Sequence, residues 1–536
     1  MRKIFLLFLI FFLGFILRFW QLGVNPPSLD WDEASLGYNA YSLFTTGKDE
    51  YGNPWPLSIR SFNDYKPPLY TYLTILPVAL TGLNEFSTRF ISALFGSLSV
   101  VIGYFLIKEL LPTKTSFFYL LSSILFAVSP WHIQFSRVAF EANMALFFFL
   151  LGIWLFLKSI SQAKFFIFSF CSFAVSAYAY HSPRLVIPVL LGGLVFIYRQ
   201  EIRKQFSWFL FGLILFIMLM LPLIVQMRLE VTARFGSVTV LNPDQRLESS
   251  IKLIDYDLAK GDFWGKLIHN RRIVYLREIL AGYLDHFNFD FLFLTGDSPG
   301  RHHAVGMGML YLWDLPFILF GIFLLMNKRN QKINTLFWWF LVAPIASSLT
   351  TGTPHAVRSI LYLPTYQIIT AVGITGFIDR LKKLKKNGKI ILFFTFTLFI
   401  LSFFYYLHMY WLHTPMEYSQ WWQYGYKQAV EEVRKLAENY QKIIVSYRYD
   451  QPYIFFLFYD KIDPSWYQGN WGGGEIKRAE RSFGKYEFRN IDWERDSKLS
   501  NTMLVGTPEE IPENTDGLVR EINFLDGSVA FRIVTK

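Results

Sequence analysis

The chain has 536 residues, of which 53% are hydrophobic and 19% aromatic, and its formal net charge is +11 at pH 7. This composition excludes an intrinsically disordered chain and is unlike that of a typical soluble domain. The excess Lys and Arg residues lie in short loops between long apolar blocks, so the charge indicates a membrane protein and no nucleic-acid partner. The single cysteine, Cys171, lies within an apolar block and excludes a disulfide framework.

Apolar windows along the sequence predict about eleven membrane-spanning helices. The first follows Met1-Arg2-Lys3 and lacks a small-residue cleavage site, so we expect a retained helix rather than a signal peptide. Several windows are shorter than about 20 residues and need burial in the bundle or flanking aromatic residues to complete a crossing. The predicted spans are residues 4–23, 86–107, 115–130, 140–157, 165–179, 185–198, 206–227, 308–327, 333–349, 356–378 and 390–411.

The loops between these spans fall into two sets of different charge. One set is short, basic and nearly free of acid, and the positive-inside rule makes it cytoplasmic together with the N-terminus. Its basic residues are Lys108, Lys114, Lys158, Lys164, Arg199, Arg203, Lys204, Lys328, Arg329, Lys332 and those from Arg380 to Lys389. The other set is extracytoplasmic and holds nearly every chemically interesting residue: 24–85, 131–139, 180–184, 228–307, 350–355 and the tail from 412.

The first outer loop contains three carboxylates in the segment Asp30-Trp31-Asp32-Glu33. Apolar residues at helical spacing predict a helix over 31–46 that lies in the membrane interface. Asp32 and Glu33 occupy its first turn, where the helix dipole favours anions. Because adjacent positions differ by about 100° around a helix, we expect only one of the two to face a common cleft. Asp30 is expected to be a solvated residue.

Cations and imidazoles occupy the same set of loops. Lys66 stands in the turn Tyr65-Lys66-Pro67-Pro68, and Arg137 and Glu141 share one helix face at the start of a span. Two adjacent histidines close the large outer loop, but adjacent side chains rarely reach the same metal ion. The further candidates are His181, Arg184, His302, His303, His355 and Arg358.

Acids and cations on several outer loops thus converge on one membrane boundary. This arrangement suits a reaction with an anionic lipid-linked donor, in which the cations bind a phosphate and a carboxylate takes a proton from the nucleophile. Sugar transfer from a polyprenyl phosphate, with inversion of the anomeric carbon, needs these parts. The alternative is a transporter or flippase of an anionic lipid-linked glycan, although such proteins tend to place charges at mid-bilayer and to show internal repeats.

The tail changes composition and predicts a small soluble α/β domain on the outer side. A helix is expected over Gln428 to Asn439, and strands over 443–447, 453–459 and 529–534, with a turn at Gly472-Gly473-Gly474. The predicted fold is therefore an all-α polytopic membrane bundle over residues 1–411, with outer loops 24–85 and 228–307, followed by an α/β domain over 412–536.

The runs Trp31-Asp32-Glu33-Ala34 and Tyr65-Lys66-Pro67-Pro68-Leu69-Tyr70, with Ser136-Arg137 before Glu141, resemble the GT-C superfamily of membrane glycosyltransferases. The nearest branch resembles protein O-mannosyltransferases and lipid A aminoarabinose transferases. The resemblance covers residues 1–410 and is most specific over 28–110.

The resemblance implies roles for individual residues. Asp32 would be the catalytic base with Glu33 as its neighbour, Lys66 would contact the lipid phosphate, and Glu141 would supply a second acid where relatives often have Asp. Tyr65 stands where some relatives carry a metal-binding acid, so metal dependence stays open. No cofactor is assigned, and the one candidate is a divalent metal ion. Candidates for binding the donor phosphate are Arg137, Arg184 and Arg358, and those for binding substrate are Tyr65, His181, His302 and His303.

The implied partners are a polyprenyl-phosphate sugar donor, the lipid bilayer and an acceptor protein, lipid or glycan. The implied location is the cell membrane, with the active site and the tail on the extracytoplasmic side. Neither the sugar nor the acceptor can be named from the residues.

Overall fold

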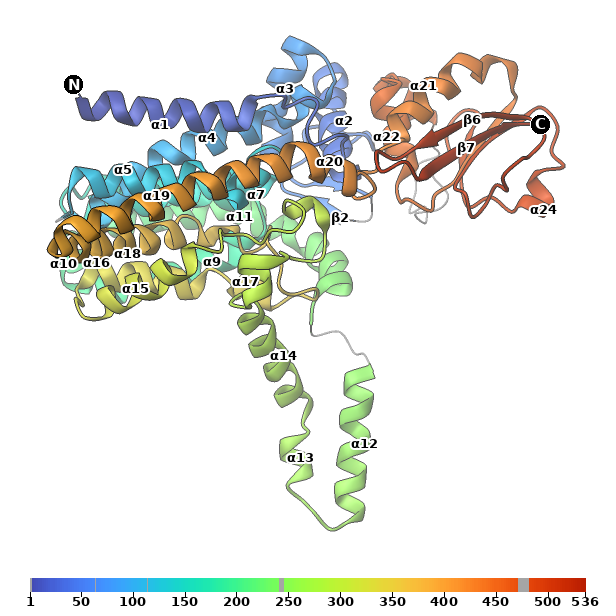
Figure 1. Cartoon of the computed structure of the whole chain (residues 1–536). Coiled ribbons are helices and arrows are strands. Elements are labelled where there is room, and N and C mark those ends of the chain that lie inside the picture. The colour runs from blue at the N-terminus through green and yellow to red at the C-terminus, as the bar shows by residue number, and fades with distance from the viewer. Residues whose placement is uncertain (1, 63, 113, 241–244, 471–481) are drawn as a thin grey trace.

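The computed structural model describes every residue except 1, 63, 113, 241–244 and 471–481. Long helices form an elongated bundle, and a smaller domain with a β-sheet lies beyond one end of it (Figure 1). Each predicted span overlaps a helix of the bundle. These helices are α1 (Arg2–Phe19), α4 (Glu85–Leu110), α5 (Ser116–Ala127), α6 (Pro130–Ser136), α7 (Glu141–Ser159), α8 (Phe165–Ala179), α9 (Ser182–Ile197), α11 (Phe206–Val238), α15 (Asp314–Met326), α16 (Gln331–Val342), α17 (Ile345–Ser348), α18 (Thr365–Leu381) and α19 (Lys385–His408). The short helix α10 (Arg199–Lys204) lies between two predicted spans.

Among the described residues, four helical stretches are long and apolar enough to cross a membrane by themselves: Glu85–Leu110, Glu141–Ser159, Phe206–Val225 and Ile360–Glu417. The pair α5 and α6, bent by 54°, makes a fifth if it forms one span. Four further apolar helices have 10–17 residues, which is shorter than a bilayer crossing normally requires: Leu69–Thr81, Phe165–Ala179, Ser182–Ile197 and Asp314–Met326. The number of about eleven spans therefore stays a prediction.

The first outer loop folds into a cap at the end of the bundle that faces the sheet domain (Figure 1). Helix α2 covers Trp31–Thr46, the range predicted from its spacing, and ends at Gly47 in the left-handed region with a φ of 70°. A short antiparallel hairpin, β1 (Ile59–Ser61) and β2 (Asp64–Lys66), leads to α3 (Leu69–Thr81). Helix α3 is not among the predicted elements, because its 13 residues lie within the predicted outer loop 24–85.

The large outer loop contains a protruding arm followed by a compact return segment. Helices α12 (Gln245–Ala259), α13 (Gly265–Ile268) and α14 (Arg271–Asp285) form the arm, which extends sideways from the bundle, away from its long axis (Figure 1). The return segment contains the π-helix η1 (Asp290–Leu294) and the 3₁₀ turn η2 (Gly300–His302), and it packs back onto the bundle.

The tail contains a five-stranded mixed sheet in the order β4-β3-β5-β7-β6. Its strands are β3 (Lys442–Val445), β4 (Tyr486–Phe488), β5 (Thr502–Gly506), β6 (Leu518–Asn523) and β7 (Val529–Thr535). The predicted helix is α21 (Tyr426–Leu436) with a 3₁₀ turn over Ala437–Asn439, and the predicted strands at 443–447 and 529–534 correspond to β3 and β7. The predicted Gly472–Gly474 turn lies outside the described residues.

The strand predicted over 453–459 is wrong, because these residues form helix α22 (Pro452–Tyr459). Pro452 opens the helix, and Tyr453 to Phe458 are all buried. A short apolar run without alternation reads equally as a buried strand or a buried helix. Helix α22 packs against α2, and their side chains share one hydrophobic core, so the tail supports the first outer loop from the side away from the bundle.

Candidate active site

The two adjacent carboxylates in the first turn of α2, Asp32 and Glu33, point in different directions. Asp30 caps the helix by accepting a hydrogen bond from the Glu33 backbone N–H at 2.8 Å, while the Glu33 carboxylate accepts one from the Asp30 N–H at 3.3 Å. This reciprocal capping box turns Glu33 back into the protein. The Glu33 side chain is 1% exposed and that of Asp32 is 41% exposed. The two side chains therefore point in different directions, as the rotation of about 100° between adjacent helical positions predicts. That one of them faces a common cleft stays a prediction.

Glu33 is held by a buried network that joins several elements. Arg89 of α4 donates to both carboxylate oxygens, from Nε to Oε1 at 2.8 Å and from Nη2 to Oε2 at 2.9 Å. The Ala139 backbone N–H also donates to Oε1 at 2.9 Å. Arg89 further donates to the carbonyl oxygens of Leu22, Pro26 and Ser28. Sequence reasoning did not single out Arg89, although a charge inside a predicted span is itself a signal of function or of pairing.

Asp32 pairs with Lys66, the lysine of the Lys-Pro-Pro turn. The Lys66 Nζ lies 2.7 Å from Asp32 Oδ1 and 3.4 Å from the Asp32 carbonyl oxygen. The β1–β2 hairpin carries Lys66 to this point, and the side chain of Lys66 is nearly buried. Burial alone would lower the pKa of Lys66, but the negative charges of Asp32 and Glu141 outweigh it and raise the pKa. The structure thus brings together Asp32, Lys66 and Glu141, three residues predicted for the site.

Asp30 differs from its prediction, since it is fully buried rather than solvated. Its Oδ2 lies 3.4 Å from Arg301 Nε, and the Arg301 guanidinium also stacks on the Trp31 ring at 4.6 Å. Burial raises the pKa of Asp30 to about 6, with the charges of Glu33 and Asp32 acting in the same direction and Arg301 opposing them. Arg301 was also missed, because its contact spans the interval between the first and the largest outer loops.

Arg137 is buried at the centre of a different set of contacts. It donates to the carbonyl oxygens of Leu17, Arg18 and Asn25 and, at 3.0 Å, to the Tyr410 hydroxyl. Its guanidinium also lies 4.8 Å from the centre of the Trp411 ring. These contacts join the end of α1 to α6 and to the π-helix η5 (Met409–His413).

The other predicted residues lie in two places. His181 Nε2 is 3.2 Å from the Tyr65 carbonyl oxygen, so the turn between α8 and α9 touches the strand that carries Lys66. Arg184 in the first turn of α9 donates to the Ala177 carbonyl oxygen at 3.1 Å. Arg358 lies elsewhere, where it donates to Thr350 Oγ1 at 2.6 Å and to the Thr351 carbonyl oxygen at 2.9 Å.

His302 and His355 meet with Asp297 in a buried cluster that could hold a metal ion. One ligand atom from each residue lies within 4.8 Å of the other two. The Asp297 carboxylate accepts from His302 Nδ1 at 2.7 Å, which leaves His302 Nε2 available as a ligand. His355 Nδ1 and Asp297 Oδ1 are buried and have no hydrogen-bond partner among the described residues. This donor set fits a divalent cation such as zinc.

The protonation states of His302 and His355 are those that metal binding requires. Burial lowers the pKa of His302, and burial together with Arg358 lowers the pKa of His355 well below its ordinary value. Both imidazoles are therefore neutral near pH 7, as metal ligands must be. The ring of His303 is turned toward its own loop, with Nε2 3.0 Å from the Asp297 carbonyl oxygen. Asp297 was missed because no local pattern marks it in the sequence.

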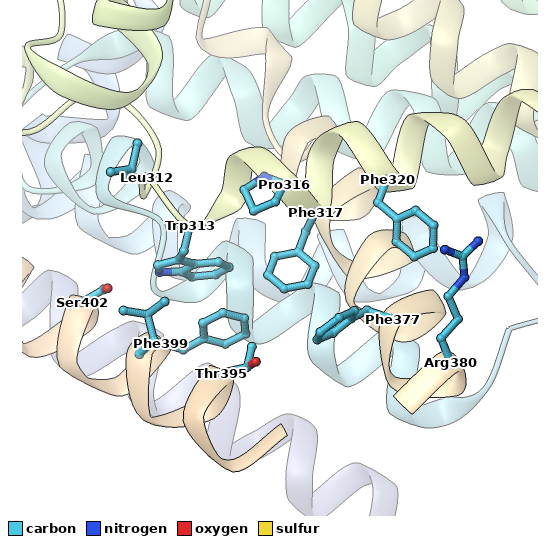
Figure 2. Close-up of a pocket in the computed structure, with 11 residues that line it drawn as sticks. Leu312, Trp313, Pro316, Phe317, Phe320, Phe377, Arg380, Thr395, Phe399 and Ser402 are labelled. Atoms are coloured by element: carbon cyan, nitrogen blue, oxygen red, sulfur yellow. The ribbon is translucent and has the colours of Figure 1, made fainter. Parts of the chain in front are cut away.

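A separate apolar cavity of about 610 Å³ lies between α15, α18 and α19 (Figure 2). Its walls are mostly apolar, with Trp313, Phe317, Phe377 and Phe399 facing one another and Arg380 at one side. The residues around Asp32 and Lys66 do not line it. The cavity is therefore distinct from the carboxylate and lysine cluster.

The N-terminal third of the sequence is similar to a known family. The family model described as dolichyl-phosphate-mannose-protein mannosyltransferase (PMT) matches residues 8–177, which include Asp32, Lys66, Arg89 and Glu141. No curated protein matches the sequence significantly.

Two groups of solved structures share the fold. ArnT from Cupriavidus metallidurans in the apo state has a TM-score of 0.53 and 10% identity, over 99% of this chain and 96% of that chain. The oligosaccharyltransferase of Archaeoglobus fulgidus, in a complex with Zn and sulfate, has a TM-score of 0.51 and 13% identity, over 85% of this chain. The present chain spans only 61% of the length of that oligosaccharyltransferase.

These findings confirm the resemblance to the GT-C superfamily that the sequence motifs predicted. The chain is a membrane protein with apolar transmembrane helices, it matches the PMT family over residues 8–177, and it has the fold shared by ArnT and the oligosaccharyltransferase AglB, both GT-C glycosyltransferases.

Proposed function

We propose that the chain is an integral membrane glycosyltransferase that moves a sugar from a polyprenyl-phosphate donor to an extracytoplasmic acceptor, with inversion at the anomeric carbon. The observation that carries this proposal is the pair of Asp32 and Lys66. A partly exposed carboxylate and a nearly buried ammonium group meet at 2.7 Å, on the loop that the PMT family model covers. The proposed topology places the N-terminus in the cytoplasm, and the pair and the tail domain outside.

The solved structures support a lipid-linked donor. ArnT from Cupriavidus metallidurans was also solved bound to undecaprenyl phosphate, with a TM-score of 0.50 and 11% identity over 99% of this chain. AglB from Archaeoglobus fulgidus was solved with an inhibitory peptide and a dolichol-phosphate, also with a TM-score of 0.50. Both lipids are polyprenyl phosphates, which is the class of donor lipid that we propose.

The contacts suggest how the pair could act. In the absence of donor, Lys66 neutralises Asp32, and its raised pKa keeps it charged. We infer that the donor phosphate replaces the Asp32 carboxylate as the partner of the Lys66 ammonium group, and that Asp32 can then accept a proton. The acceptor oxygen then attacks the anomeric carbon as its proton passes to Asp32, and the bond from that carbon to the phosphate oxygen breaks with the electron pair staying on phosphate. The anionic leaving group is stabilised by Lys66, so no general acid is needed.

The neighbouring residues take supporting roles in this proposal. Glu33 and Arg89 fix the start of α2 and thereby position Asp32, and Arg137 holds the adjoining elements together. Glu141 is the second acid beside Lys66, and Arg184 and Arg358 remain candidates for contacts with the donor. Tyr65, His181, His302 and His303 remain candidates for contacts with substrate. A divalent cation held by Asp297, His302 and His355 would add positive charge beside the loop that carries Arg301.

Reconstituted protein supplied with labelled polyprenyl-phosphate sugars and a panel of peptide, lipid and glycan acceptors would test the proposal. We expect transfer by the native chain, loss of transfer in Asp32→Asn, and unchanged transfer in Asp516→Asn, an exposed acid on the tail domain. Movement of the intact lipid across the bilayer without transfer would instead support the transporter or flippase and overturn the proposal.

A further inference from the structure

The arm formed by α12, α13 and α14, residues 245–285, is anchored where the apolar helices end. The Tyr283 hydroxyl donates to the carbonyl oxygen of Leu341 near the end of α16, and His286 Nε2 lies 2.8 Å from Ser347 Oγ of α17. On the other side of the arm, Thr239 at the end of α11 pairs with Thr350. From this base the arm projects across the bundle axis, at the end of the bundle where α2 lies (Figure 1).

Helix α14 presents an apolar stripe that the described part of the chain leaves exposed. Ile273, Leu276, Leu280 and Leu284 recur at intervals of three and four residues, so they share one helix face. They are between 42% and 65% exposed. The exposed cations Arg272 and Arg277 flank the stripe. An apolar face bordered by arginines is typical of a helix that lies in a membrane interface.

The tip of the arm has the same character. Phe263, Trp264, Leu267 and Ile268 are between 56% and 77% exposed, and Lys260 and Lys266 lie among them. Tryptophan and other aromatic residues are enriched where membrane meets water. The tip and the α14 stripe therefore place large apolar surfaces along the whole arm, which a water-exposed segment does not normally carry.

We infer that the arm lies in the interface of the bilayer that the bundle crosses, with its stripe and tip among the acyl chains and its cations at the level of the lipid phosphates. The direction of the arm favours the bilayer over a partner protein, since a segment that starts at the ends of the spans and runs across their axis follows the membrane plane. The adjoining span of α11 already faces lipid, because only 22% of its apolar window is buried. The lipid-facing surface of the bundle therefore continues into the arm.

Placement of the arm in the bilayer interface would also position the return segment that follows it in the outer loop. Helix α14 leads through His286 into the return segment that carries Asp297, Arg301 and His302. An arm held in the bilayer fixes the start of that segment at a constant depth. The inference does not depend on the proposed transfer reaction.

Spin-label accessibility in nanodiscs tests the inference. Cys171 is the only cysteine, so a Cys171→Ser background allows labels to be attached at Leu276→Cys and Leu280→Cys on the stripe and at Leu267→Cys on the tip. A label at Phe394→Cys, exposed on the apolar helix α19, gives the lipid reference, and one at the exposed Lys498→Cys of the tail gives the water reference. The measured quantity is collision with oxygen, which prefers lipid, relative to collision with a water-soluble nickel chelate.

We expect the labels on the stripe and the tip to resemble the label at position 394. Values that resemble the label at position 498 would place the arm in water and overturn the inference. Labels shielded from both reagents would show that protein, a second copy or another chain, covers the stripe, and would overturn it equally. Using three arm positions keeps the test decisive if one variant fails to fold.

Discussion

Neutralising the two adjacent acids of α2 should have opposite effects on stability and activity. Asp32→Asn removes the charge of a partly exposed side chain but keeps an amide oxygen that can face Lys66. Exposed ion pairs contribute about 0–1 kcal/mol. Lys66 is nearly buried but keeps the negative charge of Glu141 nearby, so we expect the free energy of unfolding to fall by about 1 kcal/mol, at the upper end of that range. Loss of a general base should lower the rate of transfer by about 10²–10⁴-fold.

Glu33→Gln alters a fully buried pair and should act mainly on stability. The substitution leaves the Arg89 guanidinium buried without its counter-charge and turns an amide N–H₂ group toward one of the donors that face Glu33. Breaking one side of a buried ion pair costs about 3–5 kcal/mol. The carbonyl oxygens around Arg89 solvate part of its charge, so we expect a loss of about 3 kcal/mol, toward the lower end of that range.

Thermal unfolding of both variants in one detergent and lipid mixture, alongside the transfer assay below their unfolding temperatures, separates the two effects. Asp516→Asn serves as the control for both measurements. The reasoning is refuted if Asp32→Asn loses as much stability as Glu33→Gln, or if Asp32→Asn retains native transfer. Either result would remove Asp32 from the role of an exposed base held in place by its buried neighbour.

Three further outcomes are expected. Lys66→Ala should weaken binding of a polyprenyl phosphate by about 10–100-fold in native mass spectrometry, because a charge-assisted hydrogen bond is lost; an unchanged affinity would contradict the phosphate role. His302→Ala and His355→Ala should each lower the metal content of the purified protein in elemental analysis while His303→Ala leaves it unchanged, and equal metal content in all three would exclude the cluster as the site. Burial raises the pKa of Asp30 from 3.8 to about 6, so the folded state binds this proton more tightly than the unfolded state does. The protonated Asp30 therefore adds stability that is complete below pH 3.8 and is lost as the pH rises through 6. This loss amounts to about 3 kcal/mol, and Asp30→Asn, which keeps a good helix cap, should abolish this part of the pH dependence of the unfolding temperature; a variant as pH-dependent as the native chain would contradict it.

Helix α2 could be predicted residue for residue because its signals are local. Asp30 and Glu33 stand at the positions of a capping box, and the apolar spacing ends before Gly47, which takes the left-handed conformation. The same locality explains why the 100° rotation between Asp32 and Glu33 already predicted that they would separate. What could not be predicted was the buried partner that holds Glu33, because Arg89 lies 56 positions away in the sequence.

The predictions that fail or are missing depend on contacts between segments far apart in the sequence. Asp30 was expected in water because nothing near it in sequence shows that Arg301 covers it. A strand is wrongly predicted where the helix over Pro452–Tyr459 lies, because a fully buried run carries no periodicity. Its burial comes from packing against both α2 and the rest of the tail domain. Asp297, His302 and His355 come from two loops, and only the fold brings them within reach of a common ion.

The capping box gives a physical reason why the proposed base and a structural acid can occupy adjacent positions. In a helix capped this way, the third helical residue must fold back to the cap, and here Glu33 does so while Arg89 holds it from α4. The second residue, Asp32, is then directed away from the protein, and α2 cannot rotate without breaking buried charge-assisted bonds. The direction of Asp32 toward Lys66 is therefore set by the stability of the fold and does not depend on substrate binding. If Asp32 is the base, as we propose, it loses little further freedom when an acceptor binds, which is the condition under which positioning lowers a reaction barrier.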